Sequence, residues 1–180
     1  NNYYVQAFGK VIAESDDLAY CVSLANANYG SVFEETGLVI WVRGMRGNSA
    51  LLHNVTPCYC NGDLISEKEA VLQMFFSYKG SVTKAADCDL NERAMLDWLT
   101  DNIPGTAVDL TGVTMLEALS FTSEGHLVAT VFEGKWLVIT GYTANLVYAI
   151  SPSEGKTKTI ALSRMRDALD NVGLFYTYVD

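Results

Sequence analysis

"GKWLVITGY", residues 134–142, is the stretch that decides the fold. Five of its nine residues are apolar, and the run is rich in the β-branched and aromatic residues that favour strands. It therefore predicts a buried strand over 135–142. The strand opens on Lys135, a cation placed where the chain enters the core. A cation at this position raises two questions: why the chain has one there, and which residue would stand there if the protein were an enzyme.

The composition is that of a globular protein. The chain has 180 residues, of which 49% are hydrophobic and 18% charged, enough for one domain with a short appendage. No apolar run approaches the ~20 residues of a membrane-spanning helix, so we expect no membrane insertion. The net charge of −9 and the scattered basic residues argue against nucleic acid as a partner. The absence of an initial Met and of a signal-peptide pattern leads us to expect a processed or trimmed piece.

The cysteines leave the redox compartment open. Cys21, Cys58, Cys60 and Cys88 could form two disulfides, with three possible pairings. Buried free thiols are the favoured interpretation, because free cysteine is among the most buried residue types. A Cys-x-Cys pair without a second pair or nearby histidines does not suit a metal site. We therefore expect neither a metal nor a cofactor.

Local patterns predict helices in the first part of the chain and mostly strands in the second. Helices are expected at 16–28, 66–80, 89–102, 114–125 and 164–172, and the helix at 66–80 begins with a capping box. Strands are expected in 1–13, 37–44, 49–55, 126–132, 135–142, 146–150, 157–163 and 174–179, with turns at 44–48 and at Glu133-Gly134.

This order of elements predicts an α+β domain with its helices packed against one side of an antiparallel sheet. The domain would cover residues 51–180. Residues 1–50 would form an N-terminal extension or a small β-rich subdomain.

Three phrases carry a resemblance to a known family. They are "NVTPCYCNGDLISEKEAV" (54–71), "GKWLVITGY" (134–142) and "LVYAISPSEGK" (146–156). In this order and spacing they resemble the papain-like cysteine peptidases, and within them the C39-like branch that processes bacteriocins with double-glycine leaders. The resemblance covers about residues 52–180 and implies a papain-like fold.

The resemblance also implies that the catalytic residues are replaced. The family's nucleophile falls on Lys68, its general-base histidine on Lys135 and the residue orienting that histidine on Ser151. The oxyanion-hole glutamine falls on Cys60. A papain-like site needs a thiolate, an imidazole within hydrogen-bond reach and a neutral donor for the oxyanion, so we expect an inactive domain with no catalytic residue.

An inactive site of this kind can keep a binding role. The residues expected to bind a protein or peptide partner are Lys68, Glu69, Lys135, Trp136 and Tyr142. The resemblance suggests a module of a larger bacterial or phage-associated protein, extracellular or at the cell surface, with an oligomer or larger assembly open. We also expect Lys68, Lys135 and Ser151 to cluster, with a salt link to Glu67 or Glu69.

Two alternatives from other classes remain. The first is an active cysteine hydrolase with a rearranged site, in which Cys60 is the nucleophile and His53 or His126 the base. The second is a purely structural assembly component that binds no ligand.

Overall fold

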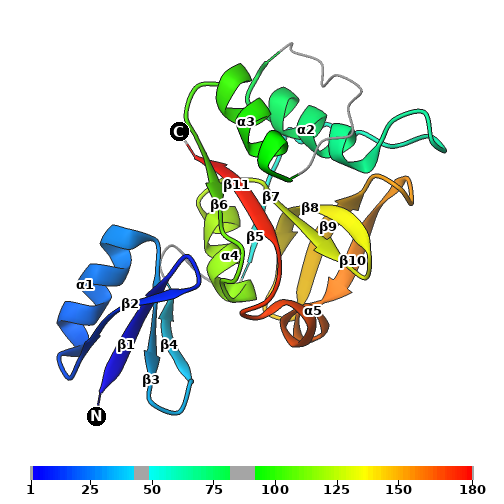
Figure 1. Cartoon of the computed structure of the whole chain (residues 1–180). Helices are drawn as coiled ribbons and strands as arrows, with labels where there is room; N and C mark the ends of the chain where they lie inside the picture. Colours follow the sequence, from blue (N-terminus) through cyan, green and yellow to red (C-terminus); the bar gives the residue numbers. More distant parts are fainter. Residues whose placement is uncertain (1, 43–48, 82–91, 180) are drawn as a thin grey trace.

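The computed structural model describes residues 2–42, 49–81 and 92–179, and these form an α+β fold (Figure 1). The helices are α1 (Leu18–Asn28), α2 (Glu67–Tyr78), α3 (Glu92–Asn102), α4 (Met115–Ser123) and α5 (Leu162–Leu169). The strands are β1 (Tyr3–Ala7), β2 (Lys10–Ser15), β3 (Ser31–Glu34), β4 (Val39–Val42), β5 (Ala50–Leu51), β6 (Thr106–Asp109), β7 (Val128–Phe132), β8 (Lys135–Tyr142), β9 (Leu146–Ser151), β10 (Lys156–Ala161) and β11 (Phe175–Val179).

The strands belong to two antiparallel sheets. The first has the order β2-β1-β3-β4, and the second has the order β10-β9-β8-β7-β11-β6 with β5 paired to β8. The prediction of an α+β fold with antiparallel strands is confirmed. The four-stranded sheet uses only residues before 43, whereas the seven-stranded sheet begins at residue 50. The division into domains 1–50 and 51–180 stays a prediction.

The four-stranded sheet carries α1 on one face, and its first hairpin is one of the places where it touches the rest of the chain. Gly9, at the turn of that hairpin, lies so close to Gly112 that a β-carbon on Gly9 would come within 3.2 Å of the Gly112 backbone. The side-chain amide of Gln6 donates a hydrogen bond to Asn171 Oδ1 at 3.5 Å. Both contacts join the N-terminal sheet to loops that flank the seven-stranded sheet.

Strand β8 is buried on both of its faces. Trp136 and Val138 belong to the core that includes α2 and α3, whereas Leu137 and Ile139 belong to the core that includes α4 and α5. The prediction that the helices lie on one side of the sheet is therefore wrong. A strand covered on one face alternates apolar and polar residues, but residues 136–139 are all apolar, because each face is covered by helices.

The segments at 37–44 and 49–55 do not form neighbouring strands of one sheet. Strand β4 pairs with β3, and the two-residue β5 pairs with β8 in the other sheet. The expected turn at 44–48 and the start of the helix expected at 89–102 involve residues outside the described ranges. Strand β6 was not predicted, because a four-residue edge strand depends on its neighbour β11 more than on its own sequence.

Helix α2 begins as the sequence predicts. The Ser66 hydroxyl accepts a hydrogen bond from the Glu69 backbone N–H at 3.2 Å, so Ser66 is the N-cap. Glu67 and Glu69 lie in the first turn, where negative charges interact favourably with the helix dipole and stabilise the helix. The buried face of α2 packs on the sheet and brings its first turn to the start of β8.

Candidate functional site

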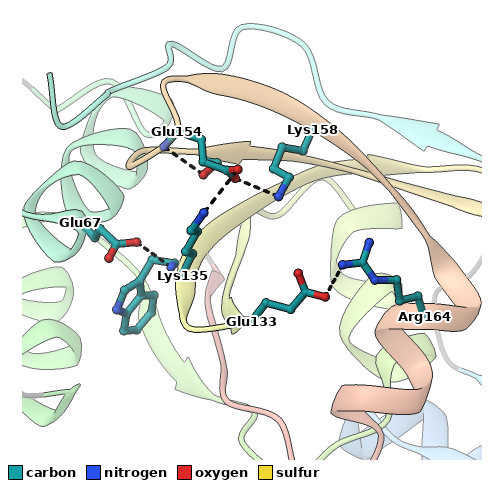
Figure 2. Close-up of polar contacts among 8 residues, drawn as sticks. Glu67, Glu133, Lys135, Glu154, Lys158 and Arg164 are labelled. Carbon is teal, nitrogen blue, oxygen red and sulfur yellow. Dashed lines mark hydrogen bonds and ion pairs between the residues drawn. The ribbon is translucent and has the colours of Figure 1, made fainter. Parts of the chain in front are cut away.

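The first turn of α2 is hydrogen-bonded to the start of β8. Glu67 Oε2 accepts a hydrogen bond from the backbone N–H of Trp136 at 2.8 Å (Figure 2). Because Trp136 directly follows Lys135, this bond fixes the helix N-terminus beside the strand position that the family resemblance assigns to the general base. The two segments are 69 residues apart in the sequence.

The carboxylate of Glu154, in the turn between β9 and β10, lies beside this contact and binds two lysine side chains. Glu154 Oε1 lies 3.4 Å from Lys135 Nζ, and Glu154 Oε2 lies 2.8 Å from Lys158 Nζ (Figure 2). The backbone N–H of Glu154 donates to the Ser151 hydroxyl at 3.4 Å. Lys135 and Ser151, two of the replaced catalytic positions, therefore both contact Glu154.

These contacts stabilise the charged form of Glu154. The pKa of the carboxyl falls to about 2, chiefly because Lys158 and Ser151 donate hydrogen bonds to it, with the charges of Lys158 and Lys135 adding to the effect. The Glu154 side chain is only 24% exposed, whereas that of Lys135 is 47% exposed. The site thus holds an ion-pair cluster centred on a carboxylate.

We expect the Glu154 carboxyl to titrate near pH 2, which a ¹³C NMR titration of the side-chain carboxyl measures. Because its folded pKa lies below the unfolded value, its contribution to stability is present above about pH 4.5 and is lost as the pH falls toward 2. Lys158→Ala should raise this pKa more than Lys135→Ala, since Lys158 is the stronger partner. An unchanged midpoint in Lys158→Ala would contradict the assignment of the cluster.

Cys60 lies beside the same turn but is not an activated thiol. Its backbone N–H donates to the Pro152 carbonyl at 3.0 Å, and its side chain is buried. Burial raises the pKa of the Cys60 thiol, and the charge of Glu67 raises it further, as other nearby groups do. A raised pKa keeps a thiol protonated at neutral pH and lowers its reactivity.

The structure places three of the positions that the sequence singles out around one turn. Lys135, Ser151 and Cys60 surround the turn after β9, and Lys68 lies in the first turn of α2. Lys135 forms its ion pair with Glu154. The expected salt link between this cluster and Glu67 or Glu69 stays a prediction. Glu67 binds a backbone N–H.

Glu154 is the residue that sequence reasoning missed. It lies four positions before Lys158, a spacing often found in ion pairs, in the turn "SPSEGK". That signal is weak, because such spacing indicates an ion pair within a helix and these residues are in a turn and a strand.

Two of the expected binding residues are core residues at different places. Trp136 is buried and lies 6.2 Å, centroid to centroid, from the ring of Tyr176. Tyr142 is buried at the other end of β8, where it pairs with Ala50, and it belongs to the core on the opposite face of the sheet. The structure therefore does not bring Tyr142 together with Lys135. Glu69, in the first turn of α2, is also buried.

The histidines lie away from Cys60. His53 is exposed just after β5, whose pairing partner is the far end of β8. His126 precedes β7 and lies at the end of the β7–β8 hairpin opposite Lys135, which pairs with Phe132.

Within residues 2–42, 49–81 and 92–179, no group of three or more His, Cys, Asp or Glu side chains could hold a metal ion. No described helix is long and apolar enough to cross a membrane.

Comparison with known proteins shows a likeness of fold. The chain resembles the crystal structure of a putative C39-like peptidase from Bacillus anthracis with a TM-score of 0.59 and 16% sequence identity. The match covers 73% of this chain and 98% of the other. No family model and no curated protein matches the sequence. The chain therefore has a fold like that of a C39-like peptidase structure.

Proposed function

We propose that this chain is a catalytically inactive, papain-like domain of the C39-like branch that acts as a binding or scaffolding module for peptide segments. Its setting would be a larger bacterial or phage-associated protein. The observation that carries the proposal is the cluster at Glu154, which engages both Lys135 and Ser151. These are the positions where the family resemblance places the general base and its orienting residue.

The residues present do not supply the chemistry of cysteine peptidases. The ammonium group of Lys135 is a hydrogen-bond donor and, paired with a carboxylate, has no lone pair with which to accept a proton. At the start of α2, the dipole that would stabilise a thiolate instead meets the carboxylates of Glu67 and Glu69. Charge at the site is therefore balanced without a nucleophile.

The alternative of a rearranged cysteine hydrolase has little support. The pKa of Cys60 is raised, its side chain is 4% exposed, and both histidines lie toward the other end of β8. Loss of the nucleophile does not remove the ability to bind, because peptide binding and bond cleavage use different residues. Leu64, which is 84% exposed in the loop before α2, gives this region an apolar contact for a partner.

A peptide array combined with mass spectrometry tests the proposal. We expect the purified chain to retain a subset of extended peptides and to release all of them at their full length. Lys135→Ala should weaken retention, because it changes the charge beside the start of α2. Iodoacetamide should modify Cys60 more slowly than a small free thiol, since the thiolate fraction is low.

Cys60→Ala and Cys58→Ala form a matched pair of controls, because both cysteines have pKa values raised by burial. Cleaved fragments that vanish in Cys60→Ala but persist in Cys58→Ala would overturn the proposal in favour of an active hydrolase. A chain that retains no peptide and runs only as a ring or filament would overturn it in favour of a structural component.

A further inference from the structure

The four-stranded sheet has a hollow on the face that α1 does not cover. Val5 and Val32 are direct partners on β1 and β3 and are fully buried in the core that includes residues of α1. The neighbouring pair, Tyr4 and Phe33, lines a cavity of about 400 Å³. This volume lies within the range of roughly 300–1,000 Å³ typical of small-ligand sites.

The lining combines aromatic rings, amides and carboxylates. The residues that matter for recognition are Tyr4, Phe33, Gln6, Asn171, Glu34 and Glu35. Gln6 and Asn171 are joined by the 3.5 Å hydrogen bond between their side chains. Because Asn171 follows α5, one wall of the cavity comes from the part of the chain that carries the seven-stranded sheet.

The charges at the rim are negative. Glu34 and Glu35 line this cavity and also a second hollow of about 170 Å³, together with Asn2 and Thr36. Glu34 Oε1 accepts from the Thr36 hydroxyl at 3.0 Å, and Glu35 Oε1 accepts from the Asn2 backbone N–H at 3.1 Å. Both donors are neutral groups, so these bonds leave the two negative charges in place.

We propose that this cavity binds a peptide segment that presents an Arg or Lys side chain. The face of an aromatic ring attracts a cation, and a carboxylate forms strong charge-assisted hydrogen bonds with guanidinium and ammonium groups. Tyr4 and Phe33 supply the rings, and Glu35 supplies the carboxylate. Glu34 pairs with Tyr3 on the face that α1 covers and adds its charge at the edge of the sheet. A neutral ligand would use the rings and amides but leave the carboxylate unmatched. The inference is independent of whether the peptidase-like site is active.

NMR titration of the ¹⁵N-labelled full chain tests the inference. The probes are the N-acetyl methylamides of arginine and lysine, and that of citrulline, which has nearly the shape of arginine without its charge. We expect the arginine and lysine probes to shift the backbone amides of Tyr4, Phe33 and Gly37 with millimolar affinity. Citrulline should shift them only at concentrations about five-fold or more higher.

Single substitutions show which side chains contribute to the affinity for arginine. Glu35→Gln should weaken arginine binding about five-fold or more, and Phe33→Leu about two- to five-fold, as expected for an exposed cation–aromatic contact. Asp167→Asn on α5 removes a charge from an exposed position elsewhere and should leave binding unchanged. Because α1 packs on the four-stranded sheet, unchanged backbone amide signals of α1 in the NMR spectrum show that a variant keeps the sheet folded.

Three outcomes would overturn the inference. Citrulline could bind as tightly as arginine, or the shifts could map to residues outside the cavity. A neutral sugar such as methyl glucoside could shift the same amides while arginine does not, which would assign the cavity to carbohydrate instead.

Discussion

Replacing Trp136 by alanine is expected to lower the free energy of unfolding by about 3–5 kcal/mol, measured by urea denaturation. The indole is 7% exposed and packs in the core between the sheet and the helices α2 and α3. Its removal leaves a cavity beside Tyr176 that the surrounding strands cannot close. The hydrogen bond from the backbone N–H of residue 136 to Glu67 does not involve the indole, so the expected loss is one of packing.

Two further variants separate packing from binding at this position. Trp136→Phe keeps an aromatic ring in the core and should lose less stability than Trp136→Ala. Leu64→Ala, at a position that is 84% exposed, should change stability by no more than about 0.5 kcal/mol. If Trp136→Ala kept nearly wild-type stability but lost peptide binding, Trp136 would be a ligand-facing residue, as the sequence resemblance implies.

The second large effect concerns a buried carboxyl at the start of α4. Glu117 is 1% exposed, and its Oε1 accepts a hydrogen bond from the Thr114 backbone N–H at 3.2 Å. Its Oε2 is buried and has no hydrogen-bond partner among the described residues. Burial raises the pKa of Glu117 to about 7, and the charge of Asp170 acts in the same direction while Thr114 opposes it.

This raised pKa makes the folded protein bind a proton that the unfolded chain releases. The unfolded carboxyl titrates near pH 4.5, so the contribution is fully present below that pH and is lost as the pH rises to about 7. The loss amounts to roughly 2–4 kcal/mol, since one pKa unit corresponds to about 1.4 kcal/mol. Urea denaturation at pH 5, 6, 7 and 8 measures it.

Glu117→Gln should remove this part of the pH dependence and be more stable than the wild type at pH 8. The amide keeps an oxygen that can accept from Thr114 but carries no charge. Asp167→Asn, which removes an exposed charge from α5, should keep the wild-type slope. A Glu117→Gln variant with the wild-type slope between pH 5 and 8 would show that the carboxyl is ionised throughout.

Features that depend on neighbouring residues in the chain were predicted well from the sequence. The N-cap at Ser66 needs only a hydroxyl three residues before Glu69, and it is confirmed. Strand β8 has the predicted bounds, because its apolar run ends in turns at both sides. The turn before it was predicted at Glu133-Gly134, and both residues have the positive φ of a two-residue hairpin, at 52° and 76°.

Much of the candidate site could also be located from the sequence, because the family resemblance rests on short phrases in a fixed order. Lys135, Ser151 and Cys60 lie around one turn, and α2 begins beside them. The roles of Trp136 and Tyr142 could not be predicted in this way. Adjacent positions of a strand face opposite sides, and only the packing of helices on both faces shows that each aromatic residue belongs to a core.

The sequence by itself determined the local elements: the cap of α2, the extent of β8 and the acidic first turn beside it. Only the tertiary structure decided that Lys135 pairs with Glu154, that β5 joins β8, and that Phe33 and the distant Asn171 line the same cavity. The physical reason is that capping and turn geometry depend on residues a few positions apart. Ion pairs, strand pairing and cavities depend on which distant segments the packed cores bring into contact.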